Sequence, residues 1–192
     1  MAVDLLAFPF VGGRVALNFV STLGKRSTDK LERLRTPEDL ARWVELAGLG
    51  SITTDEADLE AARVLREALY TLTMAALGRG PLRRADVKLV NEWAARETPA
   101  PALATGPAKT RGTGANPLRR RDPQPSASEV LAGVARDGID LLSGPDAGSI
   151  RECEDPACTL LFVDTSRSHR RRWCSMNSCG ARAKMRTLRS TP

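Results

Sequence analysis

Residues 153–158 read CEDPAC and residues 174–179 read CSMNSC, and these two stretches hold all four cysteines of the chain. Each stretch has the spacing Cys-x4-Cys, and fifteen residues separate the two. Two close thiol pairs on a short spacer suit tetrahedral metal coordination, because the spacer can fold one pair back onto the other. An all-sulfur ligand set favours zinc over hard cations. The sequence therefore predicts one structural Zn²⁺ ion, bound by Cys153, Cys158, Cys174 and Cys179.

Two other arrangements of these cysteines are considered: a pair of disulfides, and four unrelated buried thiols. The first ten residues favour a cytoplasmic protein, since Asp4 stands where a signal peptide would carry a basic residue and Pro9 interrupts a short apolar run. No stretch is long and apolar enough to suggest a membrane partner. A reducing cytoplasm argues against disulfides, and four unrelated thiols would not be expected within 27 residues and nowhere else.

The residues around the cysteine pairs predict a small β-plus-helix module. Residues 159–164, TLLFVD, have the composition of a short strand. The chain from Ser175 onward predicts a helix, with Cys179 in its first turns. On this helix Ala181, Met185 and Leu188 have helical spacing and are predicted to face inward.

Positive charge is concentrated in the same module. Residues 1–150 carry 20 Lys or Arg and 19 Asp or Glu, whereas residues 151–192 carry nine and four. No acid follows Asp164. Such a basic end predicts a polyanionic partner, most simply DNA. The predicted nucleic-acid contacts are Arg170, Arg171, Arg172, Arg182, Lys184, Arg186 and Arg189; the alternative is a solvated helix face.

Residues 1–150 predict a helical domain. Expected helices cover residues 13–24, 36–48, 54–77, 81–96 and 126–143. Their ends are marked by Thr36 and Ser126 as N-caps and by Gly48 as a C-terminal stop, and Leu82 is expected to face the core. Residues 98–125 carry six of the twelve prolines and predict a flexible loop or weak hairpin. The run Arg119–Arg121 within it is expected to be solvated, with a second phosphate contact as the alternative.

The cysteine motifs resemble the CGNR zinc-finger family. The similarity lies in LFVDTS at residues 161–166, RRWCSM at 171–176 and CGARAK at 179–184, together with the pair Cys153 and Cys158. Upstream, GRVALNFVST at residues 13–22 and LARW at 40–43 are similar to the ABATE domain that usually precedes this finger. Two differences stand out. Ala181 replaces the Asn of Cys-Gly-Asn-Arg, and Asn18 and Ser21 stand where the family favours Asp and Asn.

The resemblance implies a mostly α-helical protein with an N-terminal sensor or interaction domain, residues 1–150, followed by a treble-clef-like zinc module, residues 151–192. It also implies a stress-linked role in bacterial transcription regulation, with DNA bound by the module. An RNA-binding or protein-interaction module is the alternative. Catalysis is not expected, because His169 is the single histidine and a four-cysteine zinc site leaves no open metal position. A small-molecule effector of the helical domain is considered, and the oligomeric state is left open.

Overall fold

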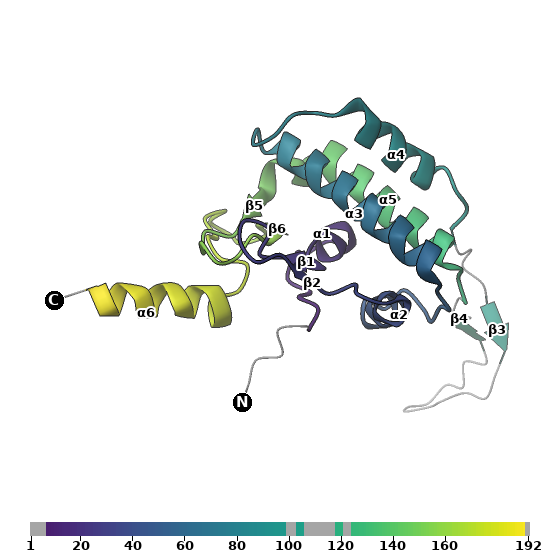
Figure 1. Ribbon diagram of the computed structural model, residues 1–192, viewed down its shortest axis with the longest axis horizontal. Coiled ribbons are helices and arrows are strands. Elements are labelled where there is room, and N and C mark those ends of the chain that lie inside the picture. The colour runs from purple at the N-terminus through teal and green to yellow at the C-terminus, as the bar shows by residue number, and fades with distance from the viewer. Residues whose placement is uncertain (1–6, 99–102, 106–117, 121–123, 191–192) are drawn as a thin grey trace.

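The computed structural model describes residues 7–98, 103–105, 118–120 and 124–190. Its main body is a helical bundle (Figure 1). The long helices α3 (Glu56–Ala76) and α5 (Ala127–Ser143) pack together, α4 (Arg84–Ala94) covers both, and the short α1 (Val15–Val20) contacts both from another side. Helix α2 (Pro37–Leu46) packs on α3. The mostly α-helical class predicted from the sequence is therefore confirmed.

The predicted caps fix where the helices begin and end. Thr36 and Ser126 each form a capping box with the residue three positions later, Asp39 and Glu129. In such a box two backbone N–H groups that lack helical partners gain side-chain acceptors. Gly48 has a φ of +71°, the left-handed conformation that glycine adopts without strain, and the chain leaves α2 there.

Leu and Val dominate the core, and a few large rings complete it. Leu17, Phe19 and Trp43 are fully buried, and the Phe19 and Trp43 rings lie 5.0 Å apart. Polar residues of the N-terminal segment also have structural roles. The Asp137 carboxylate on α5 accepts from Arg14 Nε at 2.9 Å and from the Ala16 N–H at 2.7 Å. This contact ties the start of α1 to α5.

Within the described residues, three two-stranded antiparallel hairpins complete the fold. They pair β1 (Leu23–Gly24) with β2 (Leu31–Glu32), β3 (Leu103–Thr105) with β4 (Leu118–Arg120), and β5 (Ile150–Glu152) with β6 (Leu161–Val163). The second hairpin lies within the segment predicted as a loop or weak hairpin. Residues 99–102, 106–117 and 121–123 of that segment, and with them Arg121, lie outside the described part of the chain, so its expected flexibility stays a prediction.

The β5–β6 hairpin joins the bundle to the zinc module. Ile150, Leu161 and Val163 are buried in the main hydrophobic core with the helices. The Val163 N–H donates to the Gly12 carbonyl at 2.9 Å, ahead of α1. A short 3₁₀ helix, η1 (Pro145–Ser149), leads from α5 into this hairpin. The module predicted to start at residue 151 thus shares its first strands with the core of the bundle.

Two predictions about apolar faces are wrong. Helix α4 begins at Arg84 rather than near Pro81, so Leu82 precedes the helix and is 71% exposed. The terminal helix α6 (Ala181–Ser190) extends away from the bundle (Figure 1), and its Met185 and Leu188 are 50% and 59% exposed. Helical spacing correctly places these apolar residues on one face of α6. That face stays exposed because, among the described elements, α6 contacts chiefly the turn Met176–Gly180 that precedes it.

Candidate metal centre and basic surface

The four cysteines come together from two loops and a helical turn. Cys153 and Cys158 lie in the connection between β5 and β6, where the Cys153 N–H donates to the Leu160 carbonyl at 3.0 Å. Cys174 lies in the following loop, and Cys179 lies in the π-helical turn η2 (Met176–Gly180) that starts the last helix. This agrees with the predicted position of Cys179. All four sulfur atoms lie within 4.8 Å of one another.

The spacing of these sulfurs fits a tetrahedral zinc ion. Zn–S bonds of about 2.3 Å place the corners of a tetrahedron about 3.8 Å apart. The Cys158 and Cys174 sulfurs are 3.7 Å apart, and those of Cys174 and Cys179 are 3.5 Å apart. Three of the four cysteines are buried and the fourth is half-buried. The cluster is therefore the site of one structural zinc ion.

The chemistry of the donors also favours a bound cation. Hydrogen bonds from Cys158 and Cys174 lower the pKa of the Cys153 thiol, and the hydrogen bond between Cys153 and Cys158 raises the pKa of Cys158 to about 12. Contact with Cys153 and Cys158 raises the pKa of Cys174, and burial raises that of Cys179. Four thiolates this close repel one another, so a cation between them favours their deprotonated form. A zinc ion held by these four sulfurs would supply that charge in exchange for the thiol protons.

A buried carboxylate anchors the last helix to this cluster. The side chain of Asp155, between the first two cysteines, is 0% exposed. It accepts from Arg182 Nε at 2.8 Å and from Arg186 Nη1 at 3.2 Å. Burial raises the pKa of Asp155, but these hydrogen bonds and charges, with the Ala157 N–H, together lower it below its usual value. Arg182 also donates to the Cys179 sulfur at 2.9 Å, so one guanidinium joins helix, carboxylate and metal ligand.

A second buried carboxylate shapes the loop that follows β6. Asp164 is 1% exposed and accepts from the Ser166 hydroxyl at 2.6 Å and from the Arg171 N–H at 2.9 Å. The Ser166 hydrogen bonds hold the pKa of this carboxyl below its usual value. His169 adopts a φ of +49° within the same loop, and its N–H donates to the Ser166 carbonyl. Asp164 thus folds the loop so that Arg167, His169 and Arg170 are exposed.

Two arginines of the predicted contact set pack against the module itself. The Arg171 guanidinium lies 4.4 Å from the Phe162 ring and donates to the Trp173 and Cys174 carbonyls. Arg172 lies over the Trp173 ring and forms a 2.6 Å ion pair with Glu154. That ring also explains Gly180, where a Cβ atom would approach the Trp173 ring to 2.8 Å.

The predicted nucleic-acid residues therefore fall into two groups. Arg171, Arg172, Arg182 and Arg186 bind acids, carbonyls or rings of the module. Arg170, Lys184 and Arg189 are exposed and form no ion pair with another described residue. Contact between nucleic acid and any of these seven residues stays a prediction. Arg171, Arg172, Arg182 and Arg186 in addition stabilise the module itself. Arg167 and His169 are further exposed basic groups, outside that set, on the Asp164 loop.

Sequence reasoning did not identify the roles of Asp155 and Asp164. One signal for Asp155 was available: it is an acid between two metal ligands, and Arg182 and Arg186 lie one turn apart on one face of the last helix. No local pattern joins residues that are 27 positions apart, since the metal cluster brings them together. The sequence places Asp164 at the end of the predicted strand and as the last acid of the chain, but neither feature indicates its hydrogen bonds in the loop.

Comparisons with known proteins agree with this architecture. Residues 13–145 match the ABATE family, described as "putative stress-induced transcription regulator", and residues 149–191 match the CGNR zinc finger. Neither description is that of an enzyme family. A comparison with curated proteins found no match. Within the described residues, no helix combines the length and hydropathy that a bilayer crossing needs. The chain belongs to the ABATE family and carries a CGNR zinc finger at its C-terminal end.

Proposed function

We propose that this protein regulates transcription by binding duplex DNA through the basic surface of its zinc module. The observation that carries the proposal is the exposed set Arg167, His169, Arg170, Lys184 and Arg189, which lies on the Asp164 loop and on α6. No acid follows Asp164 in the sequence to neutralise this surface. Phosphate contacts from such side chains position a protein on the DNA backbone.

The two groups of arginines have different roles in this proposal. The exposed group contacts phosphates. Arg182 and Arg186 hold α6 against the cluster through Asp155, so they fix the direction in which α6 projects. The Arg182 guanidinium donates to Asp155 and to the Cys179 sulfur, so its role is to hold the module together rather than to contact DNA. We therefore expect Arg182→Ala to weaken the module itself.

A salt titration of DNA binding tests the proposal. Each lysine or arginine that neutralises a phosphate contributes about −0.9 to the slope of log affinity against log salt. The variants Arg167→Ala/Arg170→Ala and Lys184→Ala/Arg189→Ala should each retain zinc and flatten that slope by about two units. The matched control Arg83→Ala/Arg84→Ala removes two exposed arginines at the start of α4 and should leave the slope unchanged.

The same titration separates the alternatives. Equal slopes and affinities in all four proteins would mean that the basic surface is only solvated. Binding to single-stranded RNA that exceeds binding to duplex DNA at matched salt would favour an RNA-binding module. The exposed apolar side chains Met176, Met185 and Leu188 favour a protein-interaction module as the second candidate, since duplex DNA offers little apolar surface beyond thymine methyl groups.

A further inference from the structure

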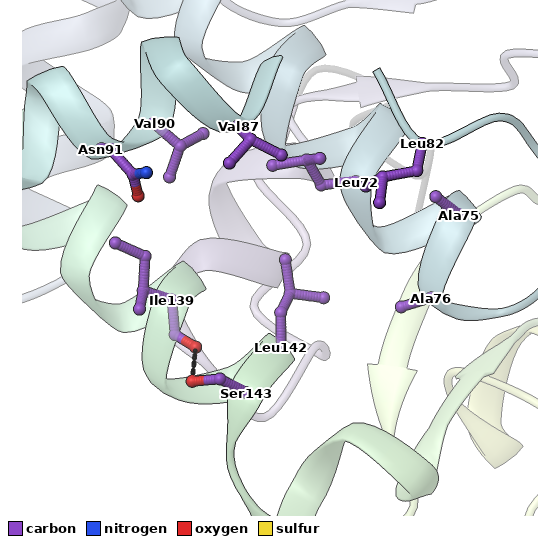
Figure 2. A pocket seen from close by; sticks show the side chains of 10 residues that line it. All are labelled: Leu72, Ala75, Ala76, Leu82, Val87, Val90, Asn91, Ile139, Leu142 and Ser143. Carbon is purple, nitrogen blue, oxygen red and sulfur yellow. Dashed lines mark hydrogen bonds between the residues drawn. The ribbon is translucent and has the colours of Figure 1, made fainter. Parts of the chain in front are cut away.

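The helical bundle contains an apolar cavity between three of its helices. Its volume is about 340 Å³, within the range of small-molecule sites. Figure 2 shows the arrangement: Val87 and Val90 of α4 and Ile139 and Leu142 of α5 reach into the same space from opposite sides, and Leu72 lies beside them. The remaining lining residues are Ala75, Ala76, Leu82, Asn91 and Ser143.

The chemistry of the lining identifies the class of ligand. None of the described residues that line this cavity is charged, and Ser143 donates its hydroxyl to the Ile139 carbonyl, as the dashed line in Figure 2 marks. The Asn91 amide is the other polar group of the lining. Two other hollows of similar size, beside α2 and between α3 and α4, are lined by glutamates and arginines such as Glu38, Arg42 and Glu67. The apolar lining of the first cavity therefore favours an uncharged, largely apolar ligand.

Exposure around the cavity shows how a ligand would be covered. Leu72 and Val90 are buried at its base, whereas Val87 is 36% exposed and Leu82 is 71% exposed. Leu82 precedes α4 in the connection from α3, so it lies at the rim on a segment outside any helix. A bound apolar molecule would remove these two side chains from water, which favours its entry.

The cavity is connected to the metal centre by two routes. Ile139 and Leu142 lie in the last turns of α5, and the chain passes from there through η1 and β5 directly to Cys153. Ala75 and Ala76 lie at the end of α3, just before Arg79, which forms an ion pair with Glu152 of β5. A shift at the ends of α3 and α5 would therefore be transmitted to β5, the strand directly before the first metal ligand.

We propose that this cavity binds a small, uncharged, apolar effector, and that its occupancy alters nucleic-acid binding by the zinc module. The first part concerns the helical bundle alone. The second part rests on the proposed function. A small molecule suits the cavity better than a peptide segment or a second copy, since its volume is at the lower end for ligand sites.

Binding of the uncharged apolar dye N-phenyl-1-naphthylamine to the full zinc-loaded chain tests the first part. Its fluorescence should rise saturably, with one dye per chain. Ala76→Phe fills the cavity from an exposed position and should weaken dye binding at least tenfold. Ala85→Phe, the same change at an exposed α4 residue outside the lining, should leave it unchanged. Circular dichroism checks that both variants fold.

Absence of dye binding, or equal binding by both variants, would overturn the site. A concentration-dependent dimer that Ala76→Phe abolishes would also overturn it, in favour of a second copy over the cavity. For the second part, saturating dye should change the affinity for duplex DNA at least threefold in the wild type and in Ala85→Phe, but not in Ala76→Phe. Dye binding without that change would overturn the coupling alone. A chain that binds dye but no DNA would contradict the proposed function and leave the site supported.

Discussion

The helical bundle and the zinc module are stabilised by different means. In the bundle, Leu and Val side chains of several helices, with Trp43 and Phe19, share one continuous core. In the module, the buried cluster consists of Cys153, Phe162, Cys174 and Cys179, so most of its members are metal ligands. A module with so little apolar area depends on its metal for folding, whereas the bundle depends on many small, separate contributions.

The β5–β6 hairpin prevents a clean division between the two regions. Leu161 is fully buried in the bundle core, whereas its neighbour Leu160 packs against the cysteine cluster. Arg26 extends the connection, because its N–H donates to the Thr159 hydroxyl at 2.9 Å. The two regions are therefore stabilised differently but share the segment that contains Leu160 and Leu161. Substitutions at these two neighbouring residues can distinguish the contribution of the bundle core from that of the metal cluster.

The largest effect is expected from Cys174→Ser. Structural zinc contributes on the order of 10–16 kcal/mol of apparent binding free energy in small zinc modules, so loss of a ligand should unfold the module. The helices of the bundle should remain, with reduced stability because the hairpin loosens. Zinc content and the far-ultraviolet circular dichroism of the purified protein measure both results.

Asn177→Ser is the matched control for that change, since Asn177 is an exposed residue between two ligands. It should retain one zinc ion per chain. Full zinc content and an unchanged module in Cys174→Ser would contradict the metal site. Complete loss of helical structure would instead show that the bundle cannot fold without the module.

The next largest effect is expected from Leu161→Ala. Truncating a fully buried leucine costs about 2–5 kcal/mol, and here the cavity opens in the bundle core although the residue belongs to the zinc-module segment. Thermal unfolding followed by helical circular dichroism should shift to lower temperature. Leu160→Ala should change that midpoint less and should weaken zinc retention against a chelator more. The reverse order of the two variants would mean that the hairpin does not join the core as described.

A smaller effect is expected from Asp155→Ala, which removes the acceptor of two arginines. Hydrogen bonds to charged groups contribute about 1.5–3 kcal/mol each when buried, and both arginines are about half exposed, so we expect a loss of about 2 kcal/mol. Chelator competition should show faster zinc release. Glu154→Ala breaks the exposed pair with Arg172 and should cost less than about 1 kcal/mol. Equal effects of the two variants would exclude an anchoring role for Asp155.

Features set by local chemistry were predictable from the sequence, and those set by distant contacts were not. Thr36, Ser126 and Gly48 mark helix ends through their own conformations and hydrogen bonds, and the structure confirms all three. The spacing of the four cysteines likewise predicts the metal site. Asp155 and Arg182, in contrast, are 27 positions apart and lie together beside the cluster of four cysteines. The sharing of β6 with the bundle depends on tertiary packing, which a strand pattern in residues 159–164 does not reveal.

The smallest effect is expected from Leu188→Ser, and it tests the corrected position of the α6 stripe. Helical spacing gives the face on which Ala181, Met185 and Leu188 lie, but it does not say whether anything covers that face. If Leu188 were buried, its removal would cost about 1.5–3 kcal/mol. Since Leu188 is 59% exposed, the change should stay within about 0.5 kcal/mol in thermal unfolding and leave zinc retention unaltered. A larger loss that grows with protein concentration would mean that a second copy covers the stripe in solution. A larger loss at every concentration would mean that α6 folds back onto its own chain, as the sequence pattern predicted.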